Sequence, residues 1–506
     1  MESGEIEWAK LWNNGKGDWD KTKLTSYLDK WYNRFDLFDE NHPFYQSATL
    51  PVTSIDAKGK QKSYAKSISN MVHELANGDN ATLFDHSNED NPPALSGSEV
   101  SRLLVAFQVF AVGGLIAFES GQDRKIFGSA DNAPLVKGAV ILVKGNNLLQ
   151  SLMLNLHKYN RDDAEPFEID RSDIPEWERE ENSLREERPK GLLDLYTWQS
   201  RRIKLIPEQN ADGQTVVTQV VIMKGNQFPD GFNLYNKEPM LAFRKILKPS
   251  KGQDPLPPLA FQEDKALWRD SLSLFKTTDN SKTNPKIVEW LSELTGDIIP
   301  LSTVYHLEIM GLVTSKAKVS LWRHERLPLP LEYLEEKNEY LLEKLRDALD
   351  MAESVGRLLG AGFVEIEIKD EKGRKKNISV PGPLRILASN ILKPGEPAKA
   401  DKEAVKSFVD SLFPSRPYWA QLGISFYELV TRLPADKSGE NEYGTTVLPW
   451  WAKEIRRAAC DAFEETTNSF DRSARMLKAV TLAENEFHIR LDKTLKDIEM
   501  KGGDKS

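Results

Sequence analysis

The spacing of apolar residues changes near Leu331, and this change constrains the fold more than any other feature of the sequence. Beyond it, apolar residues recur at steps of three and four positions, which is the period of one buried helix face: Leu342, Leu345, Leu349, Ala352, Val355 and Leu359. Similar stripes run through residues 404–412, 422–433, 451–463 and 474–495. The sequence therefore predicts a C-terminal domain, residues 331–506, built as a helical bundle.

Residues 1–330 mix both kinds of element and predict an α/β domain, so the fold class is α+β. Leu24–Trp31 and Glu99–Ala111 have helical patterns, and Ala48–Ile55 has the pattern of a strand. Two alternating runs, TWQSRRIKLI and TVVTQVVIMK, flank a turn at Asn210–Gly213 and predict a hairpin. Two more hairpins are expected, around residues 306–322 and, inserted in the bundle domain, around residues 364–380.

Composition excludes several classes of protein. The single cysteine, Cys460, rules out a disulfide framework and a cysteine-rich zinc site, and its Ala-rich helical context favours a core position. The most apolar stretch, Leu103–Phe118, is shorter than the ~20 residues of a membrane helix, and no secretory signal begins the sequence. We therefore expect a cytoplasmic protein that does not contact a membrane.

The net charge of −9 argues against nucleic-acid binding over the whole surface, but the charge is unevenly distributed. Residues 161–190 hold 12 acidic and 6 basic residues, a balance of −6. Residues 369–402 hold 9 basic and 4 acidic residues, a balance of +5. A local basic surface for DNA is compatible with this pattern.

One loop offers the only candidate catalytic cluster. Asp85, His86, Glu89 and Asp90 lie within Gly78–Ser96, a stretch rich in Asn, Asp and Pro. Their side chains suit a hard metal or acid–base catalysis, which would make the chain a metal-dependent nuclease or hydrolase. The alternative is a solvated loop, because the sequence has no HExxH, GxSxG or P-loop motif to support an enzyme.

Three stretches point in another direction: RFDLFDENHPFYQ (Arg34–Gln46), AFQVFAVGGL (Ala106–Leu115) and LYTWQSRRIKL (Leu195–Leu205). In this order, and followed by a long helical C-terminus, they resemble the CasA-type large subunit of the type I-E CRISPR Cascade complex. The resemblance implies an α/β domain followed by a four-helix bundle, and no enzymatic activity or cofactor. Some relatives carry a cysteine zinc cluster near the position of the Asn210–Gly213 turn, and we expect no metal here because this chain has no cysteine there. Relatives usually carry a further N-terminal segment that begins with a strand, and the resemblance implies that in this chain the segment is either missing or has diverged.

The resemblance also implies partners and a role. The chain would bind double-stranded target DNA, recognise the protospacer-adjacent motif (PAM), start duplex unwinding and R-loop formation, and help to recruit the CRISPR nuclease-helicase. Its other partners would be the crRNA and the remaining Cascade subunits, namely the backbone subunits and the small-subunit dimer. A purely structural scaffold subunit is the alternative within the same complex.

Family elements that face the PAM map onto short segments of this chain. The glycine-rich loop corresponds to Gly113 and Gly114, although two glycines can also simply end a helix. The lysine finger corresponds to Lys224, whose alternative is an exposed lysine at a strand end. The hairpin wedge corresponds to Ser315, Lys316 and Ala317, with lysine where well-known relatives have glutamine.

Two further candidates complete the predicted interface. Phe84 matches an aromatic contact in the family's flexible loop, where stacking on a base would contribute roughly 1–3 kcal/mol, and a buried loop anchor is the alternative. The basic hairpin would contact DNA backbone, or else form a solvated charge run, through Lys369, Lys372, Arg374, Lys375 and Lys376.

Overall fold

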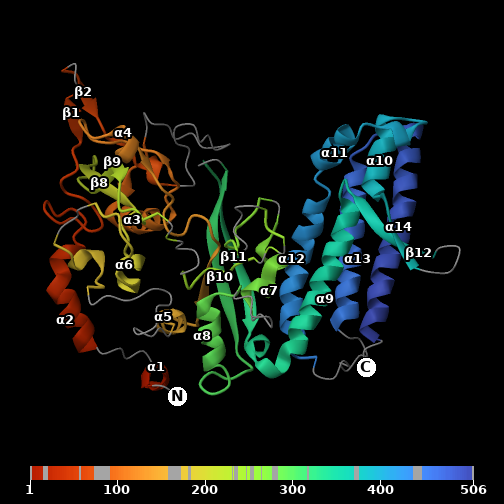
Figure 1. The fold of residues 1–506 in the computed structure, drawn as a ribbon, viewed down its shortest axis with the longest axis horizontal. Coiled ribbons are helices and arrows are strands. Elements are labelled where there is room, and N and C mark those ends of the chain that lie inside the picture. The colour runs from red at the N-terminus through yellow and green to blue at the C-terminus, as the bar shows by residue number, and fades with distance from the viewer. Residues whose placement is uncertain are drawn as a thin grey trace. The chain divides into compact units, whose positions relative to one another are not determined.

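A computed structural model gives the fold of the chain (Figure 1). It describes residues 3–14, 21–55, 59–72, 92–157, 172–180, 184–230, 232, 238–244, 246, 248–250, 256–263, 265–275, 283–315, 318–369, 375–436 and 447–503. The chain divides into two compact units: residues 1–263, 279–294 and 306–326 form the first, and residues 264–278, 295–305 and 327–506 form the second. Two segments that precede residue 330 are thus grouped with the C-terminal helices.

The centre of the first unit is a sheet around the predicted hairpin. Its strands are β8 (Arg201–Gln209) and β9 (Thr215–Lys224), which pair antiparallel as the alternating sequence indicated. The other edge of β9 pairs with two short strands, β3 (Lys66–Ser67) and β4 (Leu95–Ser96). Inward-facing residues of the hairpin, among them Ile203, Leu205, Val217 and Val220, pack in the core.

Helix α3 (Gly97–Phe110) packs against this sheet and confirms the predicted helix. A capping box starts it, because the Ser96 hydroxyl accepts from Glu99 N and the Glu99 carboxylate accepts from Ser96 N. Val100, Leu104 and Phe107 face the core on successive turns. The strand predicted over Ala48–Ile55 is shorter than expected: β1 covers only Thr53–Ile55 and pairs with β2 (Gln61–Ser63).

The second predicted hairpin also forms, with longer strands than the sequence indicated. Strands β10 (Val304–Ser315) and β11 (Lys318–Pro330) form a three-stranded sheet with β7 (Val140–Lys144). The other elements of the first unit are α1 (Ser3–Asn14), α2 (Lys21–Trp31), β5 (Gly114–Leu115), α4 (Arg124–Phe127), β6 (Ser129–Ala130), α5 (Leu148–Asn155), α6 (Leu192–Tyr196) and α8 (Lys286–Leu294).

The second unit is mainly helical. Its elements are α7 (Ser271–Leu274), α9 (Glu339–Gly356), β12 (Phe363–Lys369), β13 (Lys375–Pro381), α10 (Pro383–Leu392), α11 (Lys402–Ser411), α12 (Ser415–Arg432), α13 (Val447–Asn468) and α14 (Ala474–Gly503). Helix α9 contacts α12, α13 and α14, and α10 contacts α11 and α14. The predicted apolar stripe of α9 is buried, and two aromatic side chains donate to its backbone: Trp451 Nε1 to Ala348 O and Tyr418 Oη to Ala352 O.

Sequence reasoning missed α10, a helix of 10 residues that begins with Pro383 at its first turn. Its period is hard to read because it directly follows the inserted hairpin. Cys460 lies half-buried on α13, and burial raises the pKa of its thiol. Among the helices in the described part of the chain, none is both long and apolar enough to span a membrane.

Glu238 predicts a measurable pH dependence of stability in the first unit. Its side chain is 5% exposed, and burial raises the pKa of its carboxyl to about 7. Stability is therefore expected to fall as the pH rises from the unfolded pKa towards 7, because the folded state resists ionisation of this group. Glu238→Gln should remove this loss, which is on the order of 3 kcal/mol at pH 8. Melting temperatures of both proteins at pH 5 and pH 8 test it, and an equal pH response of the two would contradict it.

Candidate nucleic-acid interface

Three stretches that are distant in sequence are joined by hydrogen bonds around β8. Gln46 Oε1 accepts from Leu205 N at 2.8 Å. Gln108 Nε2 donates to Gln199 Oε1 and to Arg201 O, both at 2.8 Å. These residues belong to the three stretches on which the sequence resemblance rests. The resemblance therefore reflects one connected part of the molecule.

Arg201 links this network to the segment that follows α3. The side chain is only 2% exposed, and its guanidinium Nη2 donates to Asp131 O at 2.7 Å and to Val112 O at 3.1 Å, while Nη1 donates to Ser200 O at 2.8 Å. Burial lowers the pKa of Arg201 to about 10, so the guanidinium is still charged at neutral pH. One buried cation thus ties the residue before the glycine pair to the segment that faces the pair.

Gly113 and Gly114 are required for different reasons. Gly113 N donates to Asn132 Oδ1 at 2.7 Å, and a Cβ here would lie 2.8 Å from Asn132 N and 2.9 Å from Ala130 O. Gly114 has φ of 149° and is exposed at the start of β5, which pairs with β6. The two glycines do not end the helix, because the C-cap of α3 is Ala111.

Lys224 lies at the end of β9, near the same segment. Its Nζ donates to Ile126 O at 2.8 Å, and its side chain is half-buried rather than fully exposed. Ile126 belongs to α4, the short helix between β5 and β6. The structure therefore brings Gly113, Gly114 and Lys224 into one neighbourhood through α4.

The predicted wedge is described only in part. Strand β10 ends at Ser315 and β11 begins at Lys318, which places the predicted tip between two paired strands. Lys316 and Ala317 lie outside the described residues. The same is true of Phe84 and of Asp85, His86, Glu89 and Asp90.

The basic hairpin of the second unit forms as predicted, with β12 paired to β13. Lys369 stands opposite Lys375 in the register, and Lys376 is exposed opposite Ile368. Lys372 and Arg374 lie outside the described residues.

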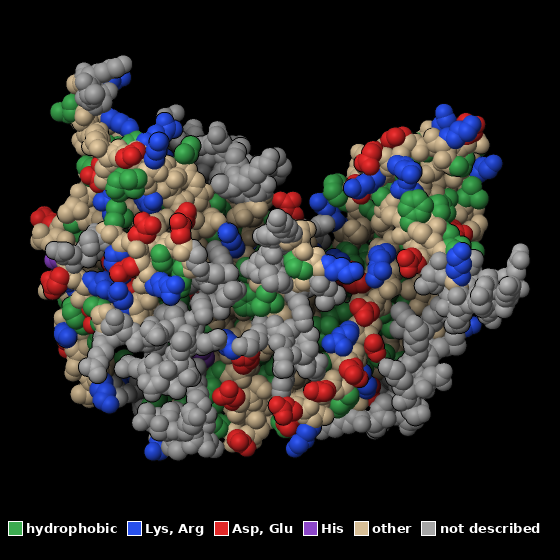
Figure 2. All heavy atoms as spheres, in the orientation of Figure 1, with side chains coloured by type: hydrophobic (Ala, Val, Ile, Leu, Met, Phe, Trp, Pro, Cys, Tyr) green, Lys and Arg blue, Asp and Glu red, His purple; other side chains and the backbone are tan. Residues whose placement is uncertain are grey.

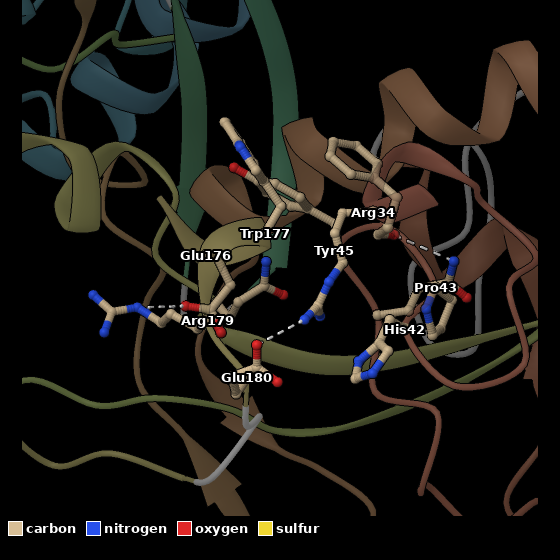
Figure 3. Close-up of a pocket in the computed structure, with 11 residues that line it drawn as sticks. Arg34, His42, Pro43, Tyr45, Glu176, Trp177, Arg179 and Glu180 are labelled. Carbon is tan, nitrogen blue, oxygen red and sulfur yellow. Dashed lines mark hydrogen bonds and ion pairs between the residues drawn. The ribbon is translucent and has the colours of Figure 1, made fainter. Parts of the chain in front are cut away.

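Sequence reasoning missed a group of charged residues near the N-terminal stretch. Figure 3 shows a small pocket where Arg34 points to Glu180 and Arg179 points to Glu176, at 3.7 and 3.4 Å. Burial raises the pKa of Glu176 to about 7 although Arg185 Nη2 lies 3.2 Å away. The cavity volume is about 40 Å³, too small for a nucleotide, and of these ion pairs only Arg34–Glu180 joins the Arg34–Gln46 stretch to residues 172–180.

No metal centre is visible in the described residues, where no three His, Cys, Asp or Glu side chains are grouped to hold an ion. Arg201 and Asn132 are further residues that the sequence did not single out. The sequence pattern could have identified Arg201, because it shares a strand face with Ile203 and Leu205. That alternation places a charged residue on the buried face of the strand.

Comparison with known proteins decides the family. The model of the family described as CRISPR-associated protein Cse1 matches residues 2–462. The chain belongs to the Cse1 family. The CRISPR-associated protein CasA/Cse1 of Thermus thermophilus is 30% identical over 478 residues, which is 93% of this chain and 82% of that protein.

Solved structures of Cse1 relatives share the fold. The crystal structure of CasA from Thermus thermophilus matches with a TM-score of 0.68 at 25% identity, covering 96% of this chain and 86% of that one. A chain of a CRISPR RNA-guided surveillance complex matches with a TM-score of 0.62 at 18% identity, covering 96% and 85%. The mixed helix and strand content of this Cse1-family chain agrees with these structures.

Proposed function

We propose that this chain is the non-catalytic large subunit of a CRISPR RNA-guided surveillance complex and that it recognises the PAM in double-stranded target DNA. The observation that carries the proposal is that Gly114, in β5, and Lys224, at the end of β9, both adjoin the β5–α4–β6 segment. Gly114 exposes backbone without a side chain, and Lys224 supplies a cation held by the Ile126 carbonyl. Backbone at a glycine can approach a groove closely, and a lysine there meets base-edge acceptors and phosphates.

The remaining predicted elements take part in the later steps. Lys316, at the tip between β10 and β11, would enter the duplex beside the PAM and begin strand separation, with Ser315 and Ala317 shaping the tip. Sequence readout beyond the PAM belongs to pairing with the crRNA. The basic hairpin of the second unit would hold DNA backbone, and Phe84 would stack on a base. A four-helix bundle in that unit would contact the small-subunit dimer, and the first unit would help to recruit the nuclease-helicase.

Binding of matched target DNA with a randomised PAM, by a crRNA-loaded complex with and without this chain, tests the proposal. We expect the chain to enrich one short motif. Lys224→Ala should lower the preference for that motif by about 5- to 150-fold, since one good base contact contributes about 1–3 kcal/mol. Lys204→Ala is the matched control, because Lys204 Nζ also donates to a backbone carbonyl, that of Ala48, at 2.8 Å from the same hairpin.

The outcomes separate the proposal from its alternatives. Equal motif preference in the wild type and in Lys224→Ala would remove Lys224 from PAM readout. A chain that joins the complex and enriches no motif would be a scaffold. DNA cleavage by the purified chain with a divalent metal would instead support a nuclease that uses the Asp85–Asp90 loop.

A further inference from the structure

Helix α4, which Lys224 contacts and which follows the β5 strand of Gly114, presents a group of exposed side chains. Arg124 and Lys125 are exposed, and Figure 2 shows Lys and Arg side chains gathered over the part of the surface where Figure 1 labels α4. Two large apolar side chains in this β5–α4–β6 segment are also exposed: Ile126 at 56% and Leu115 at 86%. An exposed combination of cations and apolar side chains is typical of a surface that meets another molecule.

The acidic side chains beside these cations are engaged elsewhere. Glu119 Oε1 accepts from Arg202 Nη2 at 3.1 Å, and Asp123 Oδ1 accepts from Lys125 N at 2.8 Å, where it caps α4. Within the part of the chain that the structure describes, the side chains of Arg124 and Lys125 form no hydrogen bond or ion pair. Their charges are therefore open to an anionic partner.

The backbone of α4 is held firmly, so its cations have a defined place. Gly128 N donates to Arg124 O at 2.9 Å, and a Cβ at Gly128 would lie 2.5 Å from that oxygen. The loop before α4 is fixed as well, because Ser120 N donates to the buried Tyr64 hydroxyl at 3.0 Å. Lys224 Nζ adds the contact to Ile126 O. The backbone that carries Arg124 and Lys125 is thus held in place next to Lys224.

We propose that α4 is a separate contact to the DNA backbone beside the PAM, in which Arg124 and Lys125 bind phosphates of the duplex that Gly114 and Lys224 face. The proposal rests on the proposed function, since it places the same duplex on the same surface. Leu115 and Ile126 cover sugar edges between the two sets of contacts. Phosphate contacts fix the register of a duplex and carry no base specificity, so α4 positions the DNA while Lys224 reads it.

The test is the double variant Arg124→Ala/Lys125→Ala in the crRNA-loaded complex, measured on matched DNA with the preferred PAM and with a mismatched PAM. We expect a loss of affinity of about tenfold or more on both DNAs. The slope of log K against log salt should become shallower by about 1.8, because each phosphate contact contributes about 0.9. Lys21→Ala/Lys23→Ala, which removes the same charge from exposed positions of α2, is the control and should change neither quantity.

Each outcome decides between the contact and the reading role. If the wild type prefers one PAM and the double variant has the same affinity and salt slope as the wild type, the α4 contact is overturned and the proposed function stands. A loss confined to the preferred PAM would also overturn it, since it would make α4 a base reader. If the wild type shows no PAM preference but the double variant still has a shallower salt slope, the α4 contact is supported and the PAM role is removed. Arg124→Lys, which keeps the cation, should retain most of the affinity and separates charge from folding.

Discussion

Gly113→Ala is expected to lower the affinity of the assembled complex for target DNA at least about tenfold. The new Cβ would lie 2.8 Å from Asn132 N and 2.9 Å from both Ala130 O and Asp131 C. All three are backbone atoms at the end of β6 and in the two residues that follow it, so no flexible side chain can move away to make room. Overpacking of this kind costs typically about 1–3 kcal/mol, and here it would separate β5 from β6 and move Gly114.

The control for this variant is Gly97→Ala at the start of α3. A Cβ there meets Phe38 and Leu37 side chains at 3.7 and 3.9 Å, which is ordinary van der Waals contact. Alanine also has a higher helix propensity than glycine, so the control should be neutral or slightly stabilising. Unchanged DNA affinity in Gly113→Ala, measured with the same complex, would show that the placement of β5 and β6 does not matter for target binding.

Arg201→Met is expected to have the largest effect on stability. Methionine fills a similar volume but leaves the buried carbonyls of Ser200, Val112 and Asp131 without their donor. Each unsatisfied buried acceptor costs about 1–3 kcal/mol, so the three together cost at least about 3 kcal/mol. The melting temperature of the first unit should fall by about 10 °C, given about 2–4 °C for each kcal/mol in a domain of this size.

The neighbouring Arg202→Met provides the comparison. Arg202 projects to the other side of β8, is 17% exposed and pairs with Glu119, an ion pair of modest value. Its replacement should lower the melting temperature much less. Equal effects of the two variants in thermal unfolding would mean that the carbonyl contacts of Arg201 contribute little.

Regular elements could be predicted from the sequence because their patterns are local. The α9 stripe and the β8–β9 alternation depend only on neighbouring residues, and both elements form where expected. The site was harder to predict. Position 113 has no room for a Cβ, because the backbone of residues 130–132 lies beside it. Arg201 stabilises the fold because its guanidinium donates to carbonyls of separate backbone segments. Such requirements arise from residues that are distant in sequence, so no local pattern reveals them.

The family resemblance supplied what local patterns could not. It singled out Gly113, Gly114 and Lys224 without a physical reason to connect them, and α4 provides that connection. It did not single out Arg124 and Lys125, because a pair of basic residues in a short helix has no distinctive pattern.

The hydrogen bonds from Gln108 to β8 also have a consequence for biosynthesis. Gln108 and Arg201 are 93 positions apart, so the backbone around the glycine pair cannot take its final form until β8 has been translated and has left the ribosome. Contacts of such long range slow folding, and the apolar face of α3 stays uncovered in the meantime. A nascent chain paused before residue 201 should therefore bind chaperones more strongly than one paused just beyond β9.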